Sequence, residues 1–554
     1  MKKSYITLAG LAIGAISLVG FAKEAPKSGD AALGRNLTTF NAIVKELQDN
    51  YVDSIAPDRA FKAAIDALLE TVDPYTVYYP AEDQETLQTM TTGEYGGIGA
   101  YLMERDSSTY ISAPMQGSPS QRAGIKAGDR ILRVDSVDVS RKRSADVTKV
   151  LRGRPNTPVT VTVQRPYATD SILTFTFNRE LLQQPSVPYY NVIGNTGYIQ
   201  LVSFIDKSPA EVRTALESFK ANPNVKNIVL DLRSNGGGLV ESAVEILGNF
   251  LPKGTEVVRT KGRDASAERV YKTTRAPMFP DIPLAVLIDG GTASASEILA
   301  GALQDLDRGV LVGSRSFGKG LVQTTRPLPY AGVLKVTVAK YYTPSGRLIQ
   351  AIDYAHRNED GSVQRVPDSL THEYKTLHGR TIRDGGGLMP DTTIDWGKVN
   401  RLVYNVVRDN WNFDYATKYA AEHPTIPAAD RFKVTDEIYS DFKASIDPKK
   451  FKYDKVMEDA MKQLRQIATE EGYLQTDSTT AAFDALEKLL RHDLNHDLDT
   501  HRKEISEYLG SEIVSRYYYD AGKTAFIIPD DKAFKTAVDI MESDRYNKIL
   551  NKKK

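Results

Sequence analysis

The sequence predicts a multidomain α/β (α+β) protein, and three observations support this fold class. The chain has 554 residues, more than one hydrophobic core usually holds. Short β-like runs with clustered glycines occupy residues 91–167, and buried strands alternate with helical segments over residues 186–397. Residues 34–90 and 398–554 show helical spacing instead. We therefore expect a small β-rich domain inserted before a mixed α/β core, with helical N- and C-terminal regions.

Composition narrows the class of function. Apolar residues make up 41% and charged residues 26%, which are ordinary values for globular protein. Lys plus Arg and Asp plus Glu each total 71, so the net charge is zero. Because the chain has no excess of positive charge, we expect no nucleic-acid partner. A local basic patch is the alternative that this argument leaves open. The chain has no cysteine, which excludes disulfides, thiolate metal ligands and cysteine nucleophiles.

Residues 1–22 are typical of an export signal. Two lysines precede an uncharged, mostly apolar run, and Gly20 and Ala22 place small residues before a cut after Ala22. We expect a cleaved signal and export to the periplasm or cell envelope of a bacterium, with a retained anchor as the alternative. Because no cysteine follows the cut, a lipoprotein is excluded.

A glycine-rich loop opens the β-rich segment. Residues 91–167 closely resemble a PDZ domain. The resemblance rests on this loop, residues 97–100, and on residues 118–129 and 135–139. Such a loop leaves N–H groups free to hold a terminal carboxylate, and a sheet edge accepts the peptide as an extra strand. The resemblance implies a peptide-binding role for the loop residues Gly97, Ile98, Gly99 and Ala100.

The first candidate for chemistry is a serine where a buried strand turns into a helix. Ser294 and Glu297 together fit a capping box, which is a complete structural explanation. A serine on such a turn is also exposed, and nearby backbone N–H groups can stabilise an oxyanion. The pattern therefore leaves a cap and a nucleophile open, with Ser296 as the neighbour most easily confused with the nucleophile.

A nucleophilic serine needs a base, and a lysine fits better than a histidine. His356, His372 and His378 come late and have no partner pattern, so a Ser-His-Asp triad is open but unsupported. Lys319 lies between two glycines after a buried strand, and burial favours a neutral amine. Gln323, on a helix or turn, would orient that amine. A surface loop with a solvated lysine and glutamine is the alternative.

Two other motifs overlap this loop and are weak. Gly313, Gly318 and Lys319 have the spacing of a P-loop, but Gly320 stands where that motif needs Ser or Thr. Ser316 and Lys319 match the penicillin-binding pattern, whose companion motifs are absent from the chain.

Three consecutive glycines form the third candidate. They follow the buried strand that ends near Asp231, and their N–H groups suit an oxyanion hole. A flexible strand-to-helix turn explains them equally well.

The order of these motifs resembles the C-terminal processing peptidases, also called tail-specific proteases. The PDZ-like segment is followed by Asp-Leu-Arg-Ser-Asn-Gly-Gly-Gly at 231–238, Ser-Ala-Ser-Glu-Ile at 294–298 and Phe-Gly-Lys-Gly at 317–320. This resemblance covers roughly residues 36–397. It implies an exported serine endopeptidase that recognises the C-terminal ends of protein substrates and cleaves through an acyl-enzyme. We expect no cofactor and no metal.

The resemblance also implies roles by position. Ser294 matches the nucleophile, Lys319 the general base and Gln323 the residue that positions it. The matches to the oxyanion hole are the N–H groups of Ala295 and of one of the glycines Gly236 and Gly237.

Hypotheses about the remaining parts are less specific. Arg152 resembles a residue that couples the PDZ domain to the core, and a solvated arginine is the alternative. The helical terminal regions would mediate homo-oligomer formation or bind an adaptor or activator protein. His492 and His496 have the spacing of metal ligands on a helix, although a solvated helical face explains them better. The non-enzymatic hypothesis is a catalytically silent PDZ scaffold of the envelope.

Overall fold

The structure, a computed structural model, describes residues 28–551 except 359 and 455, so the predicted signal lies outside the described residues. The chain divides between Pro74 and Tyr75 into two compact units. None of the described helices is long and apolar enough to cross a membrane.

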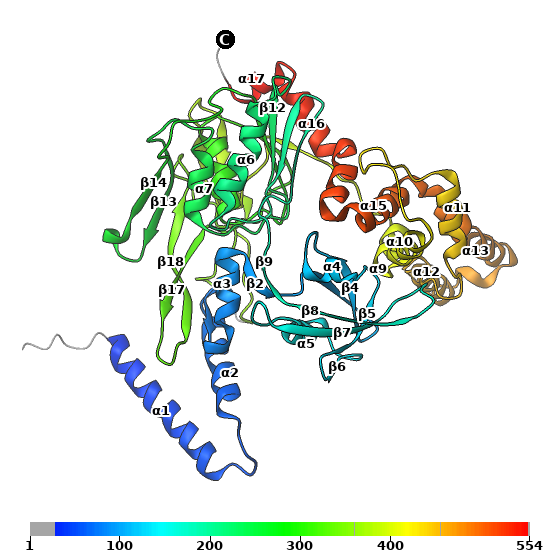
Figure 1. The fold of residues 1–554 in the computed structure, drawn as a ribbon, viewed down its shortest axis with the longest axis horizontal. Coiled ribbons are helices and arrows are strands. Elements are labelled where there is room, and N and C mark those ends of the chain that lie inside the picture. The colour runs from blue at the N-terminus through cyan, green and yellow to red at the C-terminus, as the bar shows by residue number, and fades with distance from the viewer. Residues whose placement is uncertain (1–27, 359, 455, 552–554) are drawn as a thin grey trace, which may run out of the picture. The chain divides into compact units, whose positions relative to one another are not determined.

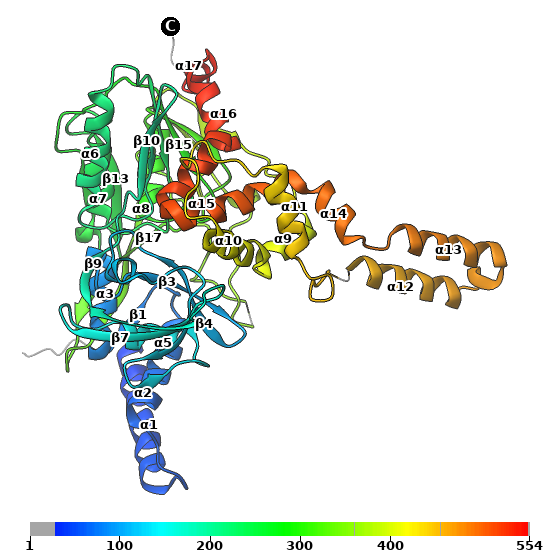
Figure 2. The ribbon, with the colours of Figure 1, turned by 45° about the vertical axis from the view of Figure 1, so that its right-hand side comes forward.

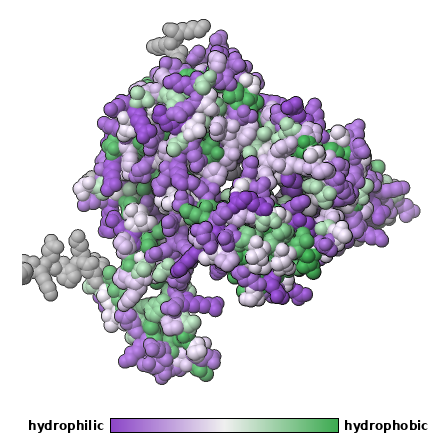
Figure 3. Space-filling view, in the orientation of Figure 1, coloured by the Kyte–Doolittle hydropathy of each residue, from purple (hydrophilic) through white to green (hydrophobic). Residues whose placement is uncertain are grey.

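The N-terminal unit is a pair of helices, α1 (Ser28–Asn50) and α2 (Pro57–Glu70). Proline suits the start of α2, because its missing N–H would have no helical partner there. The rings of Phe40 and Phe61 meet edge to face at 6.1 Å. Apolar side chains also remain exposed on this unit (Figure 3), among them Leu33, Leu37, Ile43 and Leu68.

The second unit begins with β1 (Val77–Tyr79) and α3 (Gln84–Thr92), and a β-rich domain follows. β2 (Glu94–Gly97) and β9 (Glu180–Gln183) pair where the chain enters and leaves this domain. Its main sheet has the order β3-β4-β5-β7-β8, with β6 beside β5, so β3 is an edge strand. The strands are β3 (Ala100–Arg105), β4 (Ser108–Pro114), β5 (Arg130–Val134), β6 (Val137–Asp138), β7 (Pro158–Gln164) and β8 (Ile172–Asn178). The helices are α4 (Pro119–Ala123) and α5 (Ser144–Leu151).

A six-stranded sheet with the order β10-β11-β12-β15-β16-β21 forms the core of the second unit. All neighbours are parallel except β10 and β11. The predicted buried strands are here: β12 and β15 are buried at every residue, as expected for a sheet covered on both faces. The strands are β10 (Tyr189–Ile193), β11 (Thr196–Gln200), β12 (Asn227–Asp231), β15 (Leu284–Ile288), β16 (Val310–Gly313) and β21 (Thr392–Thr393).

Helices from distant parts of the chain cover the two faces of this sheet (Figure 2). One face packs against α6 (Ser208–Lys220), α7 (Val240–Leu247) and α8 (Ala295–Asp305). The other face packs against α16 (Lys532–Met541) and α17 (Arg545–Ile549). The end of the predicted C-terminal helical region is therefore a layer of the core.

A second sheet carries the strand that follows the candidate lysine. Its order is β1-β18-β13-β14, and β17 also pairs with β18. The strands not yet bounded are β13 (Glu256–Gly262), β14 (Arg269–Lys272), β17 (Leu321–Pro327) and β18 (Val333–Tyr342).

The remaining helices follow the core along the chain (Figure 1). α9 (Arg401–Arg408), α10 (Trp411–Glu422), α11 (Asp436–Ser445), α14 (Leu494–Thr500) and α15 (Arg502–Ile527) share one hydrophobic cluster. α12 (Val456–Glu470) and α13 (Asp477–Leu489) project from it. The predicted fold class is confirmed: a β-rich domain precedes a mixed α/β core, and a helical region follows it.

The packing of α16 on the sheet has a measurable consequence. Phe534 is 4% exposed, and its ring lies 5.8 Å from the ring of Tyr198. We expect Phe534→Ala to lower the free energy of unfolding by about 3 kcal/mol, because it leaves a cavity in the core. Urea unfolding followed by circular dichroism measures this change. Leu464→Ala on α12, where the side chain is 49% exposed, is the control and should change stability by at most about 0.5 kcal/mol. Equal losses in both variants would contradict the layered core.

Candidate active site

Ser294 lies between β15 and α8, at the N-cap position of the helix. Its φ of +57° and ψ of −116° are rare for a residue with a side chain, and such strain clusters at functional sites. The predicted capping box with Glu297 is present. The Glu297 carboxylate accepts the Ser294 N–H, whereas the Ser294 hydroxyl accepts no capping hydrogen bond. The half-buried Ser294 hydroxyl is thus presented at the start of a helix.

Ser296, the rival serine, has a different environment. It is fully buried, and its hydroxyl donates to the carbonyl of Asn235 at 2.9 Å. That bond joins α8 to the loop after β12. The position of Ser296 therefore suits a structural role.

The loop with three glycines lies against the Ser294 turn. The carbonyl of Asn235 also accepts the Ala293 N–H at 3.0 Å. A Cβ placed on Gly237 would be 2.8 Å from the Cβ of Ser294 and 2.8 Å from the Ala295 nitrogen, so only glycine allows this close approach. The loop is thus fixed against the turn by hydrogen bonds and contact.

The two candidate glycines of the oxyanion hole differ in their N–H groups. The Gly237 N–H donates to the Asn235 side-chain oxygen at 2.9 Å. The N–H groups of Gly236 and Ala295, by contrast, donate to no acceptor within the described part of the chain. Gly236 is therefore the better placed of the two glycines to bind an anion.

Glu297 joins the serine turn to the lysine loop. Its fully buried carboxylate accepts the N–H of Ser294 at 2.9 Å, the N–H of Gly318 at 2.7 Å and the N–H of Lys319 at 2.9 Å. It also accepts the hydroxyl of Ser316. Burial raises the pKa of Glu297 to about 7, against the opposing effect of these hydrogen bonds.

Lys319 and Gln323 lie on the chain that leads from the lysine loop into β17. Lys319 is half-buried, and its amine stands 4.1 Å from the centroid of the Tyr75 ring. Gln323 was expected on a helix or turn, and this was wrong: it lies in strand β17. Its amide donates to the Thr337 hydroxyl on β18 at 3.0 Å. Neither residue is a solvated surface group.

The histidines do not approach Ser294. His356 and His372 pair with Asp353 and Asp384 at the surface, and His378 contacts the carbonyl of Leu550. No structural support for a Ser-His-Asp triad is found among these contacts.

His492 and His496, which were expected on one solvated helical face, do not share a helix. His492 lies in the link between α13 and α14, because Asp493 starts a new helix by accepting the N–H groups of Asn495 and His496. Among the described residues, no group of three or more His, Asp or Glu side chains could hold a metal ion.

The predicted peptide loop of the β-rich domain connects β2 to the edge strand β3. The N–H groups of Ile98 and Gly99 donate to no acceptor among the described residues, which leaves them available to a carboxylate. Gly97 ends β2, and Ala100 begins β3.

Arg152, the candidate coupling residue, ends α5 and is half-buried. Its guanidinium lies over the ring of Tyr95 on β2 at 5.2 Å, so it is not a solvated side chain. It therefore contacts the strand that enters the β-rich domain.

Family models match three parts of the chain. Peptidase family S41 matches residues 195–355, the PDZ domain matches residues 110–165, and the C-terminal helical domain of a probable PDZ-protease matches residues 402–541.

Curated relatives cover more of the chain. A carboxy-terminal-processing protease of Bartonella bacilliformis is 34% identical over 355 residues, which are 64% of this chain and 81% of the relative. This chain belongs to the C-terminal processing peptidases, peptidase family S41. A probable CtpA-like serine protease of Staphylococcus aureus N315 is 32% identical over 409 residues, covering 73% of this chain and 79% of that protein. The predicted family is confirmed, and the chain is a serine-type peptidase.

Two solved structures are also similar to this peptidase. A photosystem II D1 C-terminal processing protease is 28% identical with a TM-score of 0.36, covering 64% of this chain and 86% of that one. The PDZ domain of a carboxy-terminal protease from Vibrio cholerae, in complex with a peptide, is 29% identical with a TM-score of 0.15. That match covers 16% of this chain and 99% of the other.

Sequence reasoning missed two residues that shape the candidate site. Asn235 was read only as part of the glycine motif, yet its carbonyl and amide fix the glycine loop. Tyr75 was not singled out, although its ring lies against the Lys319 amine. A serine–lysine pair separated by 25 residues gives no local signal for either contact.

The buried carboxylate predicts a pH-dependent stability. The pKa of Glu297 lies near 7 in the folded chain, above its ordinary value of 4.5, so the folded state holds the extra proton between these pH values. Wild-type stability should therefore fall relative to Glu297→Gln as pH rises from 4.5 to 7, by up to about 3 kcal/mol. Urea unfolding of both proteins across this range measures the difference. A pH-independent difference would contradict the raised pKa.

Proposed function

We propose that this peptidase cleaves protein substrates that its PDZ domain recognises by their C-terminal ends, with Ser294 as nucleophile and Lys319 as general base. The observation that carries the proposal is the Glu297 carboxylate, which accepts the backbone N–H groups of both residues. One buried side chain thus holds the serine turn and the lysine loop in register. The order of the motifs, which resembles that of the C-terminal processing peptidases, supports the same roles for Ser294 and Lys319.

The reaction would begin with a proton transfer. Neutral Lys319 takes the proton from the Ser294 hydroxyl, and the resulting alkoxide attacks the peptide carbonyl. The protonated lysine then gives its proton to the leaving amine, and water hydrolyses the acyl-enzyme. Gln323 would position the amine after leaving its partner Thr337.

The oxyanion would bind to the N–H groups of Ala295 and Gly236. Both N–H groups are without an acceptor among the described residues, and Ala295 stands at the first turn of α8. The N-terminal end of a helix favours negative charge, which supports this choice. Gly237 is the weaker candidate, because its N–H already binds the Asn235 side chain.

The PDZ domain would bind the substrate's C-terminal carboxylate at Gly97, Ile98, Gly99 and Ala100. The N–H groups of Ile98 and Gly99 face no acceptor in the described residues, and β3 is an edge strand. An extended peptide would therefore add to β3 as an extra strand.

The proposal also includes the cellular location of the reaction and the partners of the enzyme. The pattern of residues 1–22 supports export to the periplasm or cell envelope, with cleavage after Ala22. The helical terminal regions would bind an adaptor or a second copy of the chain.

Alanine variants of the two serines test the nucleophile. We expect Ser294→Ala and Lys319→Ala each to lower cleavage of an unfolded casein by at least about a thousandfold, because each removes a reacting group. Ser296→Ala should retain cleavage, since it loses only one buried hydrogen bond to Asn235. Fluorescence of labelled casein measures the rate, and circular dichroism checks folding. Cleavage that survives Ser294→Ala but not Ser296→Ala would identify Ser296 as the nucleophile.

Blocking the peptide carboxylate tests PDZ recognition. A ten-residue peptide with an apolar C-terminal residue should bind at least about tenfold more weakly when its carboxylate is amidated, because a charge-assisted contact to the loop N–H groups is lost. Fluorescence polarisation with the Ser294→Ala protein measures both affinities. Equal affinities would exclude carboxylate recognition, while binding with no cleavage by the wild type would support the scaffold hypothesis.

A further inference from the structure

A buried tyrosine of the second sheet contacts the turn that carries Ser294. The Tyr341 hydroxyl donates to the Ser294 carbonyl at 3.1 Å, and the tyrosine is fully buried in the core. Burial, and then the charge of Glu297, raise the pKa of Tyr341 well above its ordinary value of 10. The hydroxyl therefore stays protonated at neutral pH and remains a hydrogen-bond donor.

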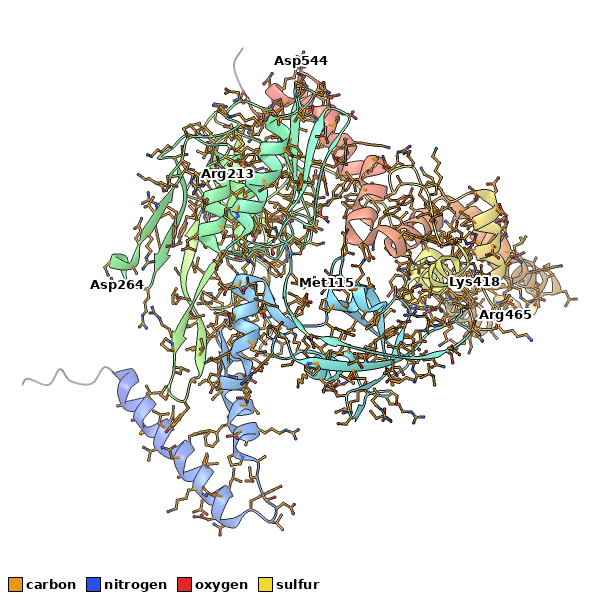
Figure 4. The ribbon with its side chains drawn as sticks, in the orientation of Figure 1. Met115, Arg213, Asp264, Lys418, Arg465 and Asp544 are labelled. Carbon is orange, nitrogen blue, oxygen red and sulfur yellow. The ribbon has the colours of Figure 1, made fainter. Side chains whose placement is uncertain are left out.

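Strand pairing places this tyrosine between the two candidate catalytic segments. Tyr341 lies in β18 opposite Thr260 of β13, the strand that leads to Asp264 (Figure 4). Its backbone N–H donates to the Gly320 carbonyl at 3.0 Å, next to Lys319. One residue of β18 thus contacts the serine turn with its side chain and the lysine loop with its backbone.

The hydroxyl binds one side of a peptide unit whose other side is a candidate oxyanion donor. The Ser294 carbonyl and the Ala295 N–H belong to the same planar unit. This unit is trans, so its carbonyl and its N–H point in opposite directions. The Tyr341 hydroxyl therefore holds the unit from the side opposite the oxyanion, and the direction of the Ala295 N–H follows from that contact.

Both backbone polar groups of Ser294 are held. Its N–H donates to Glu297 at 2.9 Å, and its carbonyl accepts the Ile298 N–H at 2.9 Å in addition to the Tyr341 hydroxyl. A serine with a φ of +57° is strained, and such a conformation persists only where its surroundings hold it. Of these three partners, Tyr341 alone lies outside α8, so it fixes the peptide unit relative to the second sheet.

The same hydrogen bond affects how strongly the Ala295 N–H can donate. A donor on a carbonyl oxygen draws electron density through the peptide resonance, which polarises the N–H of that unit. Burial strengthens the effect, because no water competes for the carbonyl. An N–H that is both aligned and polarised stabilises the charge that develops in the transition state more than it stabilises the neutral carbonyl of a bound substrate.

The Asn235–Gly236 unit, which carries the second candidate donor, is held by more contacts. Its Asn235 carbonyl accepts the Ala293 N–H at 3.0 Å and the Ser296 hydroxyl at 2.9 Å. The Asn235 side chain also donates to the Leu201 carbonyl at 2.7 Å. Loss of the Ser296 hydroxyl alone therefore leaves this unit in place. The unit beside the nucleophile depends instead on one hydroxyl from outside its helix.

We propose that Tyr341 is a positioning residue for catalysis, whose hydroxyl aligns and polarises the Ser294–Ala295 peptide unit so that the Ala295 N–H stabilises the oxyanion. This inference rests on the proposed function of Ser294 as the nucleophile. Tyr341 acts through the backbone of that nucleophile and touches no reacting atom. Loss of its hydroxyl therefore weakens binding of the transition state and leaves binding of the substrate unchanged.

Removal of the hydroxyl alone tests this role. Tyr341→Phe keeps the ring in the core, and the Ser294 carbonyl keeps the Ile298 N–H, so the variant should fold. Loss of a whole oxyanion donor lowers kcat by about 10²–10³-fold, so a misaligned donor should lower kcat by about tenfold. KM should stay within about twofold of the wild type, because the lost interaction forms only in the transition state. Rates over a range of labelled casein concentrations measure both values, and circular dichroism checks folding.

Tyr342→Phe is the matched control. Tyr342 is the next residue of β18, and its ring centroid lies 5.0 Å from the Lys261 amine, on the side of the strand away from Tyr341. Its kcat and KM should both stay within about twofold of the wild type. An unchanged kcat in Tyr341→Phe, or an equal loss in the two variants, would overturn the proposal. A raised KM with kcat unchanged would also overturn it, because that result marks a loss of uniform binding.

A peptide aldehyde tests the same contact without turnover. In the adduct, the Ser294 oxygen bonds to the aldehyde carbon, the serine proton passes to Lys319 and the aldehyde oxygen becomes the oxyanion. Calorimetry with an apolar tripeptide aldehyde should show about tenfold weaker binding to Tyr341→Phe than to the wild type, in parallel with kcat. Tyr342→Phe should bind it as the wild type does. A lowered kcat with unchanged aldehyde affinity would contradict a role at the oxyanion.

The aldehyde also separates this inference from the proposed function. If Ser294→Ala binds the aldehyde as tightly as the wild type and still cleaves casein, Ser294 is not the nucleophile and both proposals fail. If Ser294→Ala loses affinity and cleavage while Tyr341→Phe keeps both, the inference about Tyr341 fails alone.

Discussion

The site depends on one buried carboxylate. Glu297 accepts N–H groups from the serine turn and from the lysine loop, two segments that follow different strands of the core. Burying a charge is costly unless hydrogen bonds compensate for the lost water, and four donors converge on this one. The same glutamate that caps α8 therefore determines where the chain carrying Lys319 can lie. One side chain therefore both caps the helix and holds the two candidate catalytic segments together.

The core needs the end of the chain to complete it. α16 and α17 cover the sheet face that α6, α7 and α8 leave open. A polar contact reinforces this closure, because Arg233 of the glycine motif binds both Asp231 and Asp531, which caps α16. The segment that leads into the glycine loop is thus held in part by a residue almost 300 positions further along the chain. The helical region is structurally continuous with the catalytic core.

The sequence predicted what depends on local pattern and missed what depends on distant contacts. Alternation and apolar runs located β7, β12 and β15, and motif order identified the family. The strand position of Gln323 escaped because its setting comes from pairing with β18, which no local spacing reveals. The layer formed by α16 escaped for the same reason: an amphipathic helix shows that it has an apolar face but not which surface it covers.

The amine of the candidate lysine lies against an aromatic ring. The face of an aromatic ring attracts a cation, and the Lys319 amine stands 4.1 Å from the centroid of the Tyr75 ring. The proposed mechanism requires a neutral lysine, and Gln323, the residue proposed to position it, donates to Thr337 on the neighbouring strand. Tyr75 is itself placed by the Tyr354 hydroxyl, with the two rings edge to face at 5.9 Å. In the proposed mechanism, the amine would therefore have to leave the face of the Tyr75 ring, and Gln323 would have to leave Thr337, before Lys319 takes a proton from Ser294.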